Sequence, residues 1–163
     1  MNLLAIDPGP TQSAIIGYCP ENQAVHCHGL IENSQVLYRL DRLSPDHLAI
    51  EMIDCFGMAV GRDVFETVYW IGRFAERVTP ACPFTRITRR KVKMNLCNSM
   101  QAKDKNIRQA LLSRFPATGG GKTPQVGTKN SPGPLYGVSG HLWAALAVAV
   151  TWADMRELAE QGD

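Results

Sequence analysis

The sequence predicts one α/β domain in which a mixed β-sheet is flanked by helices. Three strand-like segments follow one another near the N-terminus, and further strands then alternate with amphipathic helices, which together favour a mixed sheet. The 163 residues contain no internal repeat and no linker. A content of 45% hydrophobic and 20% charged residues is typical of a globular domain that buries its own core.

The first three strands form a predicted meander. Leu3–Ile6 is an apolar run that ends at Asp7-Pro8-Gly9, and a second apolar run, Ala14–Tyr18, follows the turn. These two runs predict an antiparallel hairpin. Residues 24–31 are expected to add the third strand.

Helices and strands alternate along the rest of the chain. A short helix is expected over residues 34–43, and a strand over His47–Glu51 after a Ser-Pro-Asp turn. Asp63–Val78 is predicted to be a helix with a wide apolar face, which includes Tyr69, Trp70 and Phe74. Such a face exceeds what one sheet contact needs and indicates a homodimer interface.

The C-terminal half is expected to contain one strand, three helices and a long loop. The strand is Phe84–Ile87, and the first two helices cover residues 91–96 and 103–115. Residues 116–140 are rich in Gly, Pro, Ser and Thr, which predicts a mobile loop. The last helix is expected over Ser139–Glu160.

Two carboxylates end predicted strands. Asp7 follows the first strand, and Glu51 closes the strand that begins at His47. If these strands are neighbours, the two acids meet at one sheet edge and repel each other unless a cation lies between them. Oxygen ligands of this kind suit Mg²⁺ or Mn²⁺, and two such ions about 4 Å apart cleave phosphodiesters. Asp7 alone is also a good turn residue, but a carboxylate at a buried strand end, as at Glu51, favours the catalytic interpretation.

His141 is the candidate third ligand. The last helix is apolar nearly all round, so it should pack flat on the sheet with its first turn near the strand ends. His141 would then contact a metal or a phosphate. The alternative is a histidine that only hydrogen-bonds to the backbone at the helix start.

A basic stretch predicts a surface for a polyanion. Residues 86–108 contain eight Lys and Arg and a single acid, Asp104, although the whole chain has a net charge of only +2. An ordinary exposed helix usually mixes charges of both signs, so the imbalance favours nucleic-acid binding.

Several other functions are excluded. Gly119–Thr123 resembles a phosphate-binding loop, but Pro116 replaces the required first glycine and a helix precedes it, so no nucleotide cofactor is expected. No apolar run reaches the ~18 residues that span a bilayer, so no membrane association is expected. Five scattered cysteines and no basic signal segment indicate reduced thiols in the cytoplasm.

Nearly the whole chain resembles the RuvC family of Holliday-junction resolvases, especially its phage and prophage branch. The resemblance rests on motifs in the right order: Leu4–Gly9, Leu48–Glu51, Arg90–Lys93 followed by Lys103–Ile107, and Trp143–Val150. It implies an RNase H-like fold over residues 1–163, a homodimer, a divalent metal, and nicking of four-way or other branched DNA as a crossover junction endodeoxyribonuclease.

The resemblance also implies roles for individual residues. Asp7 would bridge two metal ions, Glu51 would hold the ion that activates water, and His141 would bind a metal or orient the phosphate. The DNA backbone would be held by Lys93, Lys103, Lys105, Arg89 and Arg90.

The chain departs from the family at one position. The family usually carries two acids one turn apart at the start of the last helix, where this chain has His141 and Ala144. No acid lies between Asp104 and Asp154 to replace them, so the second metal is expected to bind weakly. Two alternatives follow: a branched-DNA-binding homologue that does not cut, and an RNA-directed nuclease on the same fold.

Overall fold

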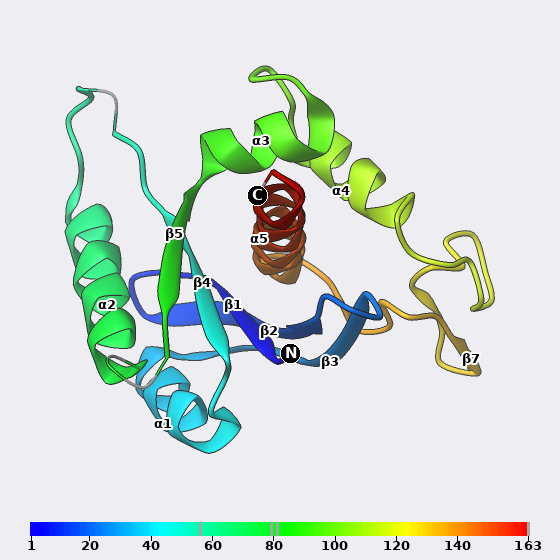
Figure 1. Cartoon of the computed structure of the whole chain (residues 1–163), viewed down its shortest axis with the longest axis horizontal. Helices are drawn as coiled ribbons and strands as arrows, with labels where there is room; N and C mark the ends of the chain where they lie inside the picture. Colours follow the sequence, from blue (N-terminus) through cyan, green and yellow to red (C-terminus); the bar gives the residue numbers. More distant parts are fainter. Residues whose placement is uncertain (56, 79, 81, 163) are drawn as a thin grey trace.

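A mixed five-stranded sheet forms the centre of the molecule in the computed structural model, which describes residues 1–55, 57–78, 80 and 82–162 (Figure 1). The strands of this sheet are β1 (Leu3–Asp7), β2 (Gln12–Cys19), β3 (Ala24–Glu32), β4 (His47–Met52) and β5 (Phe84–Thr88). Their order is β3-β2-β1-β4-β5; β1 pairs antiparallel with β2 and parallel with β4. The predicted mixed sheet and the predicted meander are confirmed.

Helices cover both faces of the sheet. The helices of the described residues are α1 (Asn33–Leu43), α2 (Arg62–Val78), α3 (Arg89–Cys97), α4 (Asp104–Leu112) and α5 (Leu142–Gln161). In Figure 1, α5 crosses one face of the sheet beneath α3 and α4, while α1 and α2 lie together on the other side. None of the helices among the described residues is long and apolar enough to cross a membrane.

Alternation along the strands sorts the core into two clusters. Leu3 and Ala5 of β1 pack in the cluster that contains α5, whereas Leu4 and Ile6 pack in the cluster that contains α1 and α2. Because successive side chains of a strand point to opposite faces, Asp7 points to the α5 side. The same alternation in β4 directs the side chain that follows Ile50 to the α5 side.

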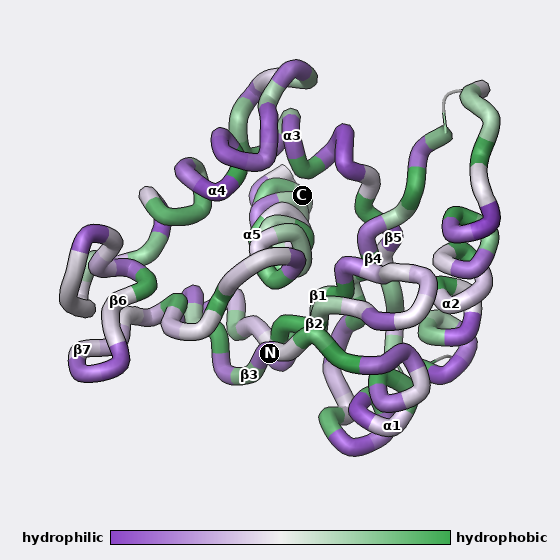
Figure 2. Tube along the Cα trace, turned by 180° about the vertical axis from the view of Figure 1, so that it is seen from behind, coloured by the Kyte–Doolittle hydropathy of each residue, from purple (hydrophilic) through white to green (hydrophobic). Residues whose placement is uncertain are grey.

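The small side chains of α5 let this helix lie close to the sheet. Its residues from Ala145 to Val150 are buried, and the helix packs across β1, β2 and β4. Figure 2 shows hydrophobic colour along α5 and mostly hydrophilic colour on the outer helices α3 and α4. The helix begins at Leu142, and the preceding His141 lies 3.3 Å from Asp7 at the end of β1, so the first turn of the helix is near the strand ends, as the sequence predicted.

The segment between α4 and α5 has regular structure of its own. It contains the short strands β6 (Gly127–Thr128) and β7 (Ser131–Pro132) and buries Leu135 and Val138 in the core. Gly133 allows two chain segments to approach closely, because a Cβ atom there would lie 2.2 Å from the carbonyl oxygen of Pro124. The mobility expected for residues 116–140 stays a prediction.

Two sequence-based details are corrected. Helix α3 starts at Arg89 rather than Lys91, because the Thr88 hydroxyl accepts a hydrogen bond from the Lys91 backbone amide and caps the helix there. Phe74 of α2 is fully buried against the sheet and therefore cannot belong to an interface.

Candidate active site

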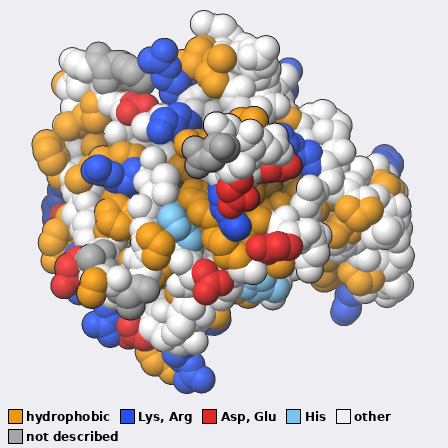
Figure 3. Space-filling model, in the orientation of Figure 1, with side chains coloured by type: hydrophobic (Ala, Val, Ile, Leu, Met, Phe, Trp, Pro, Cys, Tyr) orange, Lys and Arg blue, Asp and Glu red, His pale blue; other side chains and the backbone are white. Residues whose placement is uncertain are grey.

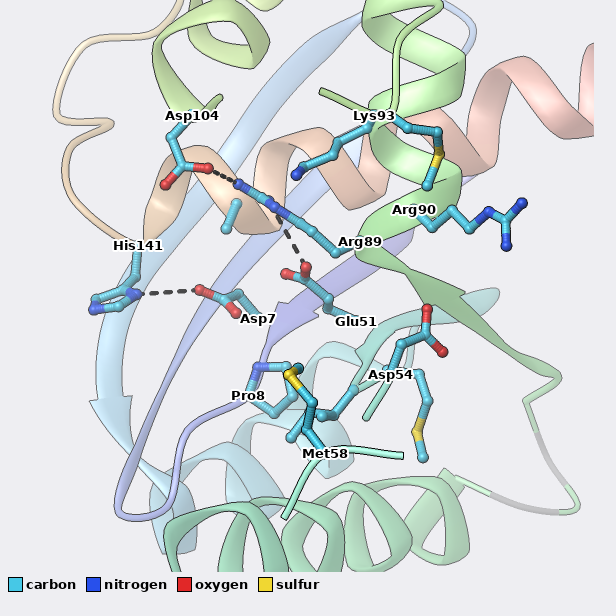
Figure 4. A pocket seen from close by; sticks show the side chains of 14 residues that line it. Asp7, Pro8, Glu51, Asp54, Met58, Arg89, Arg90, Lys93, Asp104 and His141 are labelled. Carbon is cyan, nitrogen blue, oxygen red and sulfur yellow. Dashed lines mark hydrogen bonds and ion pairs between the residues drawn. The ribbon is translucent and has the colours of Figure 1, made fainter. Parts of the chain in front are cut away.

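A cleft of about 570 Å³ opens at the carboxyl ends of β1 and β4 (Figure 4). Strand, loop and helix residues line it, and the charged or ionisable ones are Asp7, Glu51, Asp54, Arg89, Arg90, Lys93, Asp104 and His141. The mixture of acids and bases at one sheet edge distinguishes this cleft from the apolar core beneath it.

Asp7 and Glu51 form the floor of the cleft. The β1–β4 register pairs Ile6 with Ile50, so the two acids follow neighbouring partners and point to the same face. Their side chains are only 17% and 15% exposed. The predicted meeting of these two carboxylates is therefore found in the structure.

Burial changes the acidity of both groups. Loss of solvent is the main reason that the pKa of Asp7 is raised, although His141, Glu51 and Arg89 oppose the rise. Burial and the nearby charge of Asp7 raise the pKa of Glu51 to about 7. Two carboxylates in this state hold a proton readily, and a divalent cation could replace that proton.

His141 lies at the end of the cleft beside Asp7. Its Nδ1 atom is 3.3 Å from Oδ2 of Asp7, and its side chain is 74% exposed. It occupies the N-cap position of α5 but makes no side-chain capping hydrogen bond. The imidazole therefore faces Asp7 rather than capping the helix, and its role as a ligand stays a prediction.

Arg89 and Asp104 form a charged pair that the sequence did not place in the site. The Arg89 guanidinium bonds to Asp104 through Nη2, and its Nη1 atom lies 3.7 Å from Oε1 of Glu51 (Figure 4). The sequence pattern assigned Arg89 to the DNA backbone and counted Asp104 only as the single acid of a basic stretch. The only feature of the sequence that could have drawn attention to Asp104 was its position in the first turn of a helix.

The other basic candidates are divided between the cleft and the surface. Lys93 and Arg90 line the cleft, on the same helix as Arg89. Lys103 and Lys105 are exposed at the start of α4 and do not line it. Basic and acidic side chains are interspersed on the face that Figure 3 shows, in keeping with the small net charge.

Metal ligands are limited in number. Ala144 lies one turn after His141 and lines the cleft without a donor atom. Among the described residues, no three His, Cys, Asp or Glu side chains are close enough to share a metal ion as they stand. Asp54 also lines the cleft, but its side chain is exposed. Asp7 and Glu51 are oxygen donors suited to Mg²⁺ or Mn²⁺, so the donor chemistry fits such an ion.

Comparisons with known proteins identify the fold. No protein-family model and no curated protein matches the sequence. The structure is similar to RuvC from Thermus thermophilus, with a TM-score of 0.71 and 18% identity over 98% of this chain and 97% of that chain. It is also similar to T. thermophilus RuvC in complex with a Holliday junction substrate, with a TM-score of 0.69 and 18% identity over 98% of this chain and 96% of the other.

A viral protein has a more distant likeness. The Fowlpox virus resolvase, solved with its substrate Holliday junction DNA, gives a TM-score of 0.54 at 10% identity over 95% of this chain and 98% of that one. At these identities the comparisons establish the fold alone. The chain therefore has the RNase H-like fold of RuvC, as the sequence predicted.

Proposed function

We propose that the protein is a metal-dependent, structure-selective endonuclease that nicks four-way or other branched DNA, as a crossover junction endodeoxyribonuclease of RuvC type. The observation that carries the proposal is the pair Asp7–Glu51, whose side chains are mostly shielded from solvent at the ends of adjacent parallel strands in an open cleft. Solved structures of the same fold hold Holliday junction DNA. We further propose that the chain is of the phage and prophage type, because its motifs resemble that branch, and that it acts in the host cytoplasm, which its five free cysteines fit.

Asp7 and Glu51 would hold Mg²⁺ or Mn²⁺, and His141 would complete the site through Nδ1 or contact the phosphate. A divalent ion bound there supplies Lewis acidity and lowers the pKa of a bound water. Asp7 and Glu51 fix the position of that chemistry, because both belong to strands of the rigid sheet. His141 is exposed and can adjust to the substrate.

Basic side chains would guide the DNA backbone to the acids. Lys93 and Arg90 line the cleft, while Lys103 and Lys105 extend the positive surface onto α4. Contacts of this type release counterions, so they bind phosphate without reading sequence.

A homodimer would present two such sites to the two opposed strands of a junction. Phe65 and Tyr69 of α2 are 67% and 58% exposed, and Val68 between them is 40% exposed. Figure 3 shows hydrophobic side chains along the edge of the molecule over α2.

Sedimentation at micromolar concentration tests this interface. The double variant Phe65→Asp with Tyr69→Asp should be a monomer. A wild type that is already monomeric contradicts paired nicking.

Nicking of a synthetic four-way junction tests the function. With Mn²⁺ or Mg²⁺ we expect paired nicks in the junction and far slower nicking of a linear duplex of the same sequence. An RNA–DNA hybrid in parallel reactions separates a junction nuclease from an RNA-directed one. Equal cleavage of all three substrates contradicts structure selectivity.

A second candidate is a branched-DNA-binding protein that does not cut. The observation in its favour is Ala144, because the cleft lacks a donor one turn after His141. Tight junction binding without nicking in any divalent metal would select this candidate.

A further inference from the structure

Arg89 is held in the cleft with one nitrogen unused. Its Nη2 atom bonds to Asp104, and its Nη1 atom is 3.7 Å from Oε1 of Glu51, which is too long for a hydrogen bond. The Nη1 atom is buried and has no hydrogen-bond partner among the described residues. The guanidinium therefore offers a free donor beside the proposed catalytic carboxylate (Figure 4).

This arrangement is unfavourable without a ligand. A buried donor that lacks an acceptor loses the hydrogen bonds it made with water. Arg89 is also the first residue of α3, where a positive side chain opposes the positive end of the helix dipole, and the first turn holds no acid. An anion placed at Nη1 would satisfy the donor and interact favourably with both charges.

Asp104 fixes the direction of the guanidinium. It comes from α4, while Arg89 comes from α3 and Glu51 from β4, so three elements converge on the pair. The Asp104 side chain is 88% exposed, whereas Arg89 is 31% exposed. Asp104 thus holds the outer nitrogen at the rim and leaves the inner nitrogen directed toward the floor.

We infer that Arg89 is a catalytic residue that binds the scissile phosphate through Nη1, and that Asp104 is the residue that positions it. This inference rests on the proposed function. A planar guanidinium can bond to Asp104 through Nη2 and donate a charge-assisted hydrogen bond to a phosphate oxygen through Nη1. Its fixed charge stabilises the negative charge that builds on the phosphate oxygens during cleavage.

A lysine away from the cleft provides the control. Lys122 is exposed in the loop before α5 and does not line the cleft. Its replacement by Ala removes one positive charge, as Arg89→Ala does, but changes no side chain of the proposed site. It should therefore leave the metal affinity and the nicking rate at saturation unaltered.

The test compares Arg89→Ala with Lys122→Ala in two measurements. The first is Mn²⁺ binding to the free protein, and the second is single-turnover nicking of a four-way junction at saturating protein and metal. Arg89→Ala should bind Mn²⁺ roughly three- to tenfold more tightly, because a competing positive charge is removed. It should nick roughly 10²- to 10³-fold more slowly. Lys122→Ala should match the wild type in both measurements.

Two outcomes overturn the inference. One is wild-type nicking by Arg89→Ala at saturation, and the other is unchanged or weaker Mn²⁺ binding by a variant whose folding is intact by circular dichroism. A wild type that nicks no junction refutes the nuclease function and the role of Arg89 together. A wild type that nicks as fast as Arg89→Ala refutes only the role of Arg89.

Further variants separate charge from geometry. Arg89→Lys keeps the positive charge but loses the planar guanidinium. It should nick at least roughly tenfold more slowly than the wild type, while its Mn²⁺ affinity stays near that of the wild type. Nicking at the wild-type rate by Arg89→Lys overturns the role of the guanidinium. Asp104→Asn should slow nicking roughly tenfold in the wild type and have no effect in Arg89→Ala. An equal loss in both backgrounds overturns the positioning role of Asp104.

Discussion

The two halves of the site differ in how they are held. Asp7 and Glu51 extend from neighbouring strands of a paired sheet and are 17% and 15% exposed. His141 and Asp104 come from helix starts at the rim and are 74% and 88% exposed. The strand half fixes where the chemistry occurs, and the helix half is free to adjust to the DNA. We therefore expect substitutions in the strand half to have the larger and less condition-dependent effects.

The largest effect should come from Asp7→Asn. Loss of one ligand charge should remove metal binding and lower nicking by about 10³-fold or more, while junction affinity measured by gel shift stays nearly intact. Asp54→Asn is the matched control, because this acid lines the same cleft but is exposed. If Asp7→Asn nicks at the wild-type rate, Asp7 only forms a turn and has no catalytic role, and the strand half of the site is not more important than the helix half.

The strand half could be predicted from the sequence, because strand geometry is local. An apolar run that ends in an acid, repeated at Glu51, locates both carboxylates once the strands are neighbours. Alternation along β1 even determines the face to which Asp7 points. The order of the strands could be predicted from the meander of the first three strands and from the helix that follows it.

The helix half could not be predicted in the same way. Arg89 and Asp104 are fifteen residues apart, and their contact depends on the angle at which α4 returns across α3. Charge counting grouped Arg89 with the lysines, because a pattern of like charges does not specify which one faces inward. His141 was found because it directly precedes a helix whose apolar sequence requires that helix to lie against the sheet.

The basic surface of α3 and α4 should control affinity rather than chemistry. Replacement of Lys93, Lys103 and Lys105 by Ala should reduce the slope of log affinity against log salt by roughly two to three units. Nicking at saturating protein should change little. Lys122 and Lys129, exposed in the loop before α5, provide a control pair. If the control pair changes the slope equally, the DNA-binding surface is not confined to α3 and α4.

The buried acids should make the metal-free protein less stable as pH rises. The pKa of Glu51 is raised from 4.5 to about 7, so the folded state holds its proton more tightly than the unfolded state. The resulting stability is present below pH 4.5 and is lost as pH rises through 7. Urea unfolding should show that Glu51→Gln gains about 1–3 kcal/mol relative to the wild type between pH 5 and pH 8.

Asp104→Asn is the control for this pH effect. Asp104 lies in the same charge network, with Asp7 and Arg89 also facing Glu51, but it is exposed. Its replacement should leave the pH dependence almost as it is in the wild type. A pH dependence that persists in Glu51→Gln would mean that the proton belongs mainly to Asp7, since both pKa values are raised.

The smallest effect should come from restoring an acid to α5. The wild-type site holds fewer negative charges than one with a second acid on the last helix, so two divalent ions repel each other with less compensation. Imidazole also suits Mn²⁺ better than Mg²⁺. We expect the wild type to need millimolar metal and to favour Mn²⁺. Ala144→Asp should lower the Mg²⁺ concentration for half-maximal nicking by roughly three- to tenfold.

A metal titration of junction nicking distinguishes this effect from simple crowding of the cleft. Ala144→Asn has nearly the same shape as Ala144→Asp but no charge, so it should leave the Mg²⁺ requirement unchanged. If the wild type already saturates at low Mg²⁺ and Ala144→Asp adds nothing, another acid completes the site. Asp54 and Asp104 are then the candidates, because both line the cleft. Metal binding would in that case depend on the helix and loop side of the cleft as much as on the strands.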